Sequence, residues 1–470
     1  MAILALVSAS SASSFAESPA AGPTASTTAG AAVVTLSQCV AQALAGGPDA
    51  RISRANIGLA RAQYDDSASV NGFGLSGNLG YDRTPFTTRY SDSGVPFQVI
   101  QNSFQGGVTL SAPFSTSVSL GGTHTITELP TAADQSTNFS LTASAAVWDG
   151  YPGGQSLATA RIAAFTRQGT ESTESSSQKT VVYNVKQAYY TLLGQQQQIN
   201  ILEQTLAQRE AELQKTQSLY DARNVSQIDL KQAQVNRLQA ALDLSKARGL
   251  LEVDRELLSN LVGWTADTVY EVGDVPDMPL PTLDTATAIQ TAIANRDDFR
   301  QIQLSLQSSD VSLALKKALT NPTVSVNTGV SYLKDWTNSS NNNPSWRAGV
   351  TVKAPVIDPG SLGAQVREVA LQQEKLRIQK DQLASTIATN VKSAVFSLRD
   401  LLARVDLARQ SLDLAQVQYD LAAAQYANGV ISHLDVLTAS VTLTTAQVNS
   451  TAAQSSAQLG VLALQNAMGQ

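Results

Sequence analysis

The sequence has little of what catalytic and metal sites require. It contains one cysteine, Cys39, and two histidines, His124 and His433, which lie far apart along the chain. One cysteine excludes an internal disulfide, and these three residues give little support to a metal site or a Cys–His pair. We find no Gly-x-Ser-x-Gly, no His-Glu-x-x-His, no Walker loop and no Gly-x-Gly-x-x-Gly that opens a helix. We therefore expect a protein that is not an enzyme and that holds no cofactor or metal.

Charged residues are scarce as well. They make up 15% of the 470 residues, against roughly 25% in ordinary soluble domains. The net charge of −6 and the lack of basic clusters argue against nucleic acid as a partner. There is no run of about 18 apolar residues, which excludes a membrane-spanning helix. Serine, threonine, glutamine and asparagine supply most of the polarity, a composition that suits transmembrane β-barrels.

The amino terminus resembles a targeting segment. Residues 1–16 contain an apolar run followed by the small residues Ser14 and Ala16, which suit cleavage by a signal peptidase. The basic region that normally comes first is missing, so we expect a truncated start; a plain apolar tail is the alternative. Residues 17–34 are rich in Ala, Ser, Thr and Pro and are expected to be disordered.

A ten-residue segment occurs twice, 206 positions apart. Residues 220–229 and 426–435 share tyrosine, serine and aspartate at the same offsets, and a glycine follows each tyrosine by 43 residues. We interpret this match as an internal duplication. The matching residues are Tyr220, Ser226, Asp229 and Gly263 in the first copy and Tyr426, Ser432, Asp435 and Gly469 in the second.

Apolar residues also recur every seven positions in both copies. This period predicts long helices wound left-handedly around a neighbour. Residues 155–218 would form about 95 Å of helix at about 1.5 Å per residue, and residues 227–262 would return part of the way. The positions that recur are Val185, Leu192, Ile199, Leu206, Leu213 and Tyr220, then Val391, Leu398, Val405, Leu412, Tyr419 and Tyr426.

Between the helical regions the apolar period changes to two. Residues 72–150 and 323–358 alternate apolar residues with glycine and small polar residues. Alternation over about ten residues predicts transmembrane strands, although a soluble antiparallel sandwich alternates in the same way. The first region is much the longer, which indicates an extra hairpin or two strands that extend past the membrane.

One chain offers too few strands to close a membrane barrel, and open edges in lipid cost several kcal/mol per unpaired backbone group. We therefore expect an internally duplicated α+β membrane protein in which several chains share a transmembrane β-barrel, continued by an α-barrel of long antiparallel coiled-coil helices. The expected boundaries are a first repeat at 35–263 (strands about 72–150, helices about 154–263), a linker at 264–283, and a second repeat at 284–469 (strands about 323–358, helices about 361–469).

This layout resembles the TolC-like outer-membrane efflux channel family over roughly residues 35–469. The resemblance is carried by the repeated turns with their closing glycines and by three short motifs. Residues 146–150 and 354–358 are similar to the family's Pro-Leu-Phe-Asp-Gly-Gly junction between strand and helix, and residues 294–298 open the second copy.

The resemblance implies a homotrimer in the cell outer membrane, with a twelve-stranded barrel built from four strands of each chain and a helical part in the periplasm. It implies an exit duct of a tripartite efflux or type I secretion system, which passes small molecules or polypeptides. Its partners would be a periplasmic adaptor protein and an inner-membrane pump, with no cofactor. The adaptor would dock at the helix turns, at Asn224, Val225, Gly429 and Val430.

The resemblance also implies a periplasmic gate at Asp435, Tyr426 and Asp229. The family's linking arginine falls on Ile431 and a second ring aspartate on Thr438, so the salt-bridged lock is not reproduced. Independently of the resemblance, three copies of Asp435 near a pore axis would repel one another unless a cation pairs with them, which favours a cation-selective constriction. The alternative is that Asp229 and Asp435 only cap the helices that they begin.

Two other classes of protein stay open at this point. A periplasmic coiled-coil adaptor also combines helical hairpins with a β-domain, but it lacks an alternating-strand hairpin in each half. An enzyme on a repeat scaffold is disfavoured by the missing catalytic motifs.

Overall fold

The computed structural model describes residues 32–69, 72–90, 96–112, 116–128, 133–223, 225–264, 270–273, 284–338, 342–355, 360–428 and 430–470. The predicted signal peptide, most of segment 17–34 and of linker 264–283, and the turn residues Asn224 and Gly429 lie outside this part.

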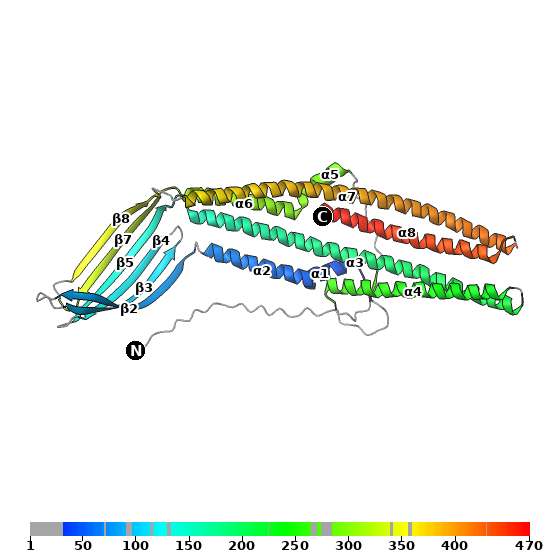
Figure 1. The fold of residues 1–470 in the computed structure, drawn as a ribbon, viewed down its shortest axis with the longest axis horizontal. Helices are drawn as coiled ribbons and strands as arrows, with labels where there is room; N and C mark the ends of the chain where they lie inside the picture. Colours follow the sequence, from blue (N-terminus) through cyan, green and yellow to red (C-terminus); the bar gives the residue numbers. More distant parts are fainter. Residues whose placement is uncertain are drawn as a thin grey trace. The chain divides into compact units, whose positions relative to one another are not determined.

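The helices form two sets of matched length (Figure 1). α1 and α5 have 11 residues each, α2 and α6 have 22, α3 and α7 have 67, and α4 and α8 have 36 and 35. No helix in the described ranges is long and apolar enough to cross a membrane. The first set is α1 (Leu36–Gly46), α2 (Pro48–Ser69), α3 (Gln155–Asp221) and α4 (Gln227–Val262); the second is α5 (Thr285–Asn295), α6 (Asp297–Ala318), α7 (Ser361–Ala427) and α8 (His433–Ala467).

Six long strands form one antiparallel sheet, in the order β2-β3-β4-β5-β7-β8 (Figure 1). β5 pairs with β7, so the sheet joins the two copies of the repeat. The strands are β2 (Gly74–Tyr90), β3 (Pro96–Ala112), β4 (Thr116–Glu128), β5 (Ala133–Trp148), β7 (Thr323–Asp335) and β8 (Asn343–Lys353).

Within the described residues this sheet has six strands, two more than the four that the resemblance implies each chain gives to the barrel. Four lie between α2 and α3, and two lie between α6 and α7. The surplus takes the form of a further hairpin, β3 and β4. The physical reason is that this segment carries its own period-two pattern and a full ladder of partners on both sides.

A second, small sheet pairs β1 (Ala32–Val34) in parallel with β6 (Tyr270–Val272). The end of the segment expected to be disordered is thus a strand. The Tyr189 hydroxyl lies 3.0 Å from the carbonyl oxygen of Val34 and 2.8 Å from that of Gly273, which ties α3 to this sheet.

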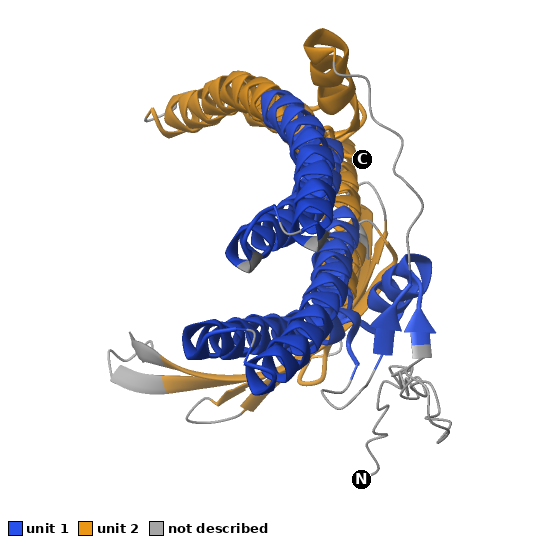
Figure 2. Cartoon of the chain, turned by 90° about the vertical axis from the view of Figure 1, so that its right-hand side faces the viewer, with its two compact units in different colours: residues 1–52, 178–283, 394–466 blue, residues 53–177, 284–393, 467–470 orange. Residues whose placement is uncertain are grey.

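The chain divides into two compact units (Figure 2). The first unit comprises residues 1–52, 178–283 and 394–466 and holds both helix turns, α3 to α4 and α7 to α8. Its core surrounds the fully buried Tyr189 and Leu192 of α3 and includes Cys39. Burial raises the pKa of the Cys39 thiol to about 11, so this cysteine is an inert packing residue.

The second unit comprises residues 53–177, 284–393 and 467–470 and holds the six-stranded sheet. Asp149 follows β5 and accepts hydrogen bonds from the backbone N–H groups of Tyr151 and Gln155, which starts α3. Gly150 follows it with φ +88°, and a Cβ there would meet the Ala318 carbonyl oxygen at 2.7 Å. The strand-to-helix motif at 146–150 therefore works as a helix cap with a close backbone crossing.

Candidate functional site: the helix turns

The two turns that join the long helices are built alike. In the first, the Ser226 hydroxyl accepts a hydrogen bond from the Asp229 N–H, and the Asp229 carboxylate accepts one from the Ser226 N–H at 2.9 Å. In the second, the Asp435 carboxylate accepts a hydrogen bond from the Ser432 N–H, also at 2.9 Å. This reciprocal arrangement is a capping box, which starts α4 and α8.

Both aspartates are exposed as well as capping. The hydroxyl and the N–H of Ser432 hold the pKa of the Asp435 carboxyl below its ordinary value, because both hydrogen bonds favour the charged form. A capping role and a role in a pore are therefore compatible, since the cap keeps Asp435 ionised. The capping reading explains why serine and aspartate recur three residues apart in both copies.

The remaining predicted residues are placed as follows. Tyr426, near the end of α7, lies under the Lys215 ammonium group of α3, 5.6 Å from its ring centroid. In the two turns, Val225 is half-buried, whereas Val430 is 70% exposed. Lys215 therefore joins the turn region, and the sequence did not point to it.

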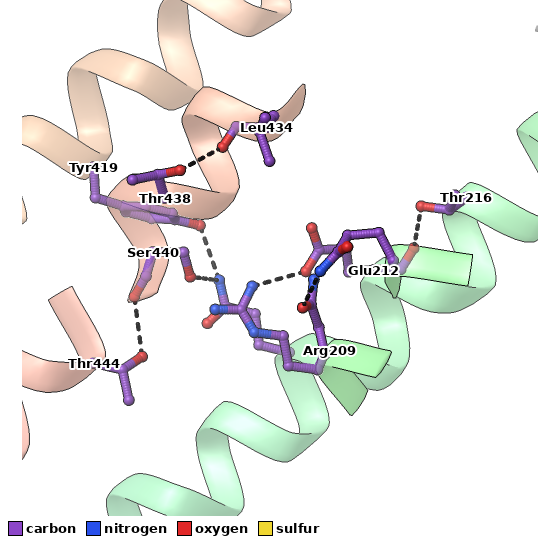
Figure 3. Close-up of polar contacts among 11 residues, drawn as sticks. Arg209, Glu212, Thr216, Tyr419, Leu434, Thr438, Ser440 and Thr444 are labelled. Atoms are coloured by element: carbon purple, nitrogen blue, oxygen red, sulfur yellow. Dashed lines mark hydrogen bonds and ion pairs between the residues drawn. The ribbon is translucent and has the colours of Figure 1, made fainter. Parts of the chain in front are cut away.

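A polar cluster ties α3 to the second helix pair (Figure 3). The Gln208 side-chain amide donates to the Tyr419 hydroxyl of α7 at 3.1 Å and to the Ser440 hydroxyl of α8 at 3.3 Å. Next to Gln208, Arg209 donates to Glu212 at 2.9 Å; the side chains are 5% and 17% exposed. One turn of α3, at residues 208–212, thus hydrogen-bonds to both α7 and α8. The same turn carries the nearly buried ion pair between Arg209 and Glu212.

Sequence reasoning missed Gln208, Arg209 and Ser440, although one signal was present. Tyr419 occupies the position where the first copy has Leu213. A tyrosine where the other copy has a leucine brings a hydroxyl that needs a partner, and that partner is Gln208. Within the described ranges, no group of three or more His, Cys, Asp or Glu side chains could hold a metal ion.

Three solved outer-membrane proteins share the fold of this chain. VceC from Vibrio cholerae aligns with a TM-score of 0.70 at 16% identity, over 92% of this chain and 96% of VceC. The CmeC channel from Campylobacter jejuni has a TM-score of 0.67 at 16% identity, over 92% and 85%. The open state of the MtrE channel from Neisseria gonorrhoeae has a TM-score of 0.65 at 16% identity, over 92% and 88%.

These alignments confirm the predicted fold class, in which long paired helices combine with an antiparallel sheet as in TolC-like channels. The model of the outer membrane efflux protein family matches residues 39–264 and 288–470. That match covers most of both halves, and the chain therefore belongs to the outer membrane efflux protein family.

Proposed function

We propose that this protein is the outer-membrane exit duct of a tripartite efflux or type I secretion system. It works as a homotrimer whose helices extend into the periplasm, and it passes small molecules or polypeptides delivered by an inner-membrane pump. A periplasmic adaptor protein joins pump and duct. Family membership supports the outer-membrane setting and the transport role.

The observation that carries this proposal is the contrast between the two faces of the sheet. Along β5, Phe139 and Leu141 lie exposed on one face, and they alternate with Ser140 and Thr142 on the other. The register continues this division across β7, where Leu141 faces Val330 and Thr142 faces Gly329. An exposed apolar face opposite a hydroxyl-rich face suits a wall with lipid on one side and water on the other.

The exposed stripes on the helices support assembly from several chains. On α4, Ile228, Val235 and Leu242 are exposed at seven-residue spacing. On α7, an exposed stripe of the same spacing consists of Leu407, Leu414 and Leu421. Stripes of this period are buried by a neighbouring helix in coiled coils. Further copies of the chain supply those neighbours in the proposed ring.

The turns form the periplasmic end of the duct in this proposal. The Asp435 side chains of the three copies make an anionic ring that passes cations, and Tyr426 narrows this constriction. Asp229, at the start of α4, adds its charge near the same ring. The link from Gln208 to α7 and α8 helps to hold this end closed. The adaptor docks on the turns at Asn224, Val225, Gly429 and Val430.

Extraction and mass measurement test the proposal. We expect the protein to leave bacterial membranes only with detergent, and native mass spectrometry of the extract to give three times the mass of the processed chain, which is below the 49.5 kDa of the full sequence. A protein released by salt or osmotic shock as a monomer or dimer would contradict the proposal and favour the periplasmic adaptor class.

A further inference from the structure

The hairpin β3–β4 has no counterpart in the second half of the chain. The connection from α2 to α3 spans residues 70–154, whereas the connection from α6 to α7 spans residues 319–360. In each half, one strand leaves the helices and one strand returns to them: β2 and β5 in the first, β7 and β8 in the second. β3 and β4 are therefore inserted between an outgoing and a returning strand, and their even number preserves the strand direction.

The hairpin carries the same two faces as the rest of the sheet. Val108 of β3 faces Leu120 of β4, which faces Leu141 of β5. All three are exposed in the single chain. One apolar row thus crosses five neighbouring strands: Val108, Leu120, Leu141, Val330 and Trp346.

The opposite face is equally continuous. The hydroxyls of Thr109 and Ser119 lie 3.0 Å apart and join β3 to β4. The hydroxyls of Ser117 and Ser144 lie 2.9 Å apart and join β4 to β5. If the hairpin projected into water, its apolar face would stay exposed to solvent, which is unfavourable. The register of this face with the apolar face of the other strands therefore favours a place in the same wall.

We infer that the inserted hairpin is part of the membrane wall, and that β8 of each copy pairs with β2 of the next to close a barrel of eighteen strands. This inference rests on the proposed trimer. β2 and β8 are the two edges of the sheet, they run in opposite directions, and an open edge in lipid is strongly unfavourable. The occupant of each edge is a second copy of this chain.

The consequence is a wider outer mouth than a twelve-stranded barrel has. Barrel diameter grows roughly in proportion to strand number, so eighteen strands give about 1.5 times the width of twelve. The apolar outer face of the hairpin then contacts lipid, and its serines and threonines line the lumen.

Disulfide trapping in native membranes tests the hairpin. In a Cys39→Ala background, the pair Ser117→Cys and Ser144→Cys should oxidise and become protected from a maleimide-polyethylene glycol label. The matched pair Ser331→Cys and Ser345→Cys, whose hydroxyls lie 2.7 Å apart between β7 and β8, should behave in the same way. Protection of the second pair with full labelling of the first would overturn the inference, because it would show that β4 is not paired with β5 in the membrane, as a continuous wall requires.

Cryo-electron microscopy of the unmodified protein in lipid nanodiscs provides the second measurement. A trimer with eighteen strands in one closed barrel is the expected result. A trimer with twelve barrel strands and three hairpins outside it would overturn the inference and leave the proposed function intact. A particle without threefold symmetry would overturn both.

Discussion

The two halves of the chain repeat their scaffold closely. α3 and α7 have equal lengths, both turns end in a Ser–Asp capping box, and both second helices close at a glycine with positive φ, Gly263 at +85° and Gly469 at +76°. They differ in strand number and in the polar cluster near the turns. The comparison teaches that the long helices and their turns are common to both halves. The strand number and the polar cluster are what distinguish one half from the other.

The junction between the two short helices, α1 and α2 in the first half and α5 and α6 in the second, is built differently in the two halves. In the first, a Cβ at Gly47 would meet the carbonyl oxygens of Ala43 and Leu261 at 2.5 and 2.9 Å, so the backbones pass too closely for a side chain. The corresponding residue of the second half is Arg296. Its guanidinium donates to the Ala467 carbonyl at 3.5 Å and pairs with Asp298 at 2.6 Å, which keeps the pKa of that carboxyl low. The first half thus has closely packed backbones at this junction, whereas the second half has the hydrogen bond and ion pair of Arg296.

We expect the largest effect from arginine substitutions in the apolar face of the sheet, which both halves share. Leu141 and Val330 face each other from different halves, and Leu141→Arg or Val330→Arg should each cost about 2–4 kcal/mol in the membrane. We expect both variants to lose the membrane-inserted trimer. Thr142→Arg, on the polar face, is the control and should keep it. Equal tolerance of arginine at 141 and 142 in membrane fractions would contradict the two-faced wall.

The junction offers the next test. Gly47→Ala should lower stability by about 1–3 kcal/mol, the usual cost of overpacking. Arg296→Ala should cost less, about 0.5–1 kcal/mol, because solvent screens its pair. The control is Gly46→Ala, since a Cβ there meets nothing within 4 Å. Thermal unfolding midpoints of the purified variants give the order; a larger loss at Arg296 would reverse the comparison.

A substitution in the polar cluster around Gln208 should have a smaller effect on stability but a measurable effect on channel opening. Gln208→Leu removes one exposed and one part-buried hydrogen bond to the second half, a net loss of about 1 kcal/mol and a roughly fivefold shift toward the open state. The control is Gln217→Leu, because among the described residues Gln217 hydrogen-bonds to Asp221 of its own helix and not to the second half. Open probability in bilayer recordings reads this out, and an equal change in both variants would show that the cross-half link does not hold the turns together.

The smallest structural change concerns the two aspartates. Asp435→Asn can retain the cap while removing one charge per chain, so we expect the reversal potential in a salt gradient to move toward zero. Asp229→Asn should move it less. The lowered pKa of Asp435 means that its charge is present at neutral pH and is lost only when the pH falls through that lowered value. Unchanged reversal potentials in Asp435→Asn would remove this residue from the constriction.

Much of the frame could be predicted from local pattern. The seven-residue period predicts α3 and α7, and the Tyr–Ser–Asp repeat predicts both turns, because helix seams and caps depend on residues close in sequence. The number of strands in the sheet could not be settled, since alternation alone does not tell an extra hairpin from longer strands. The contact from Gln208 to Ser440 joins residues 232 positions apart, and no local pattern encodes such a contact.

Single-channel recording of the purified trimer in a planar bilayer tests the central claim most directly. The account predicts discrete current steps that favour cations, with step frequency raised in Gln208→Leu and cation preference reduced in Asp435→Asn. A folded trimer that inserts into the bilayer yet never conducts, in the native form and in both variants, would contradict the claim that this protein forms a gated duct.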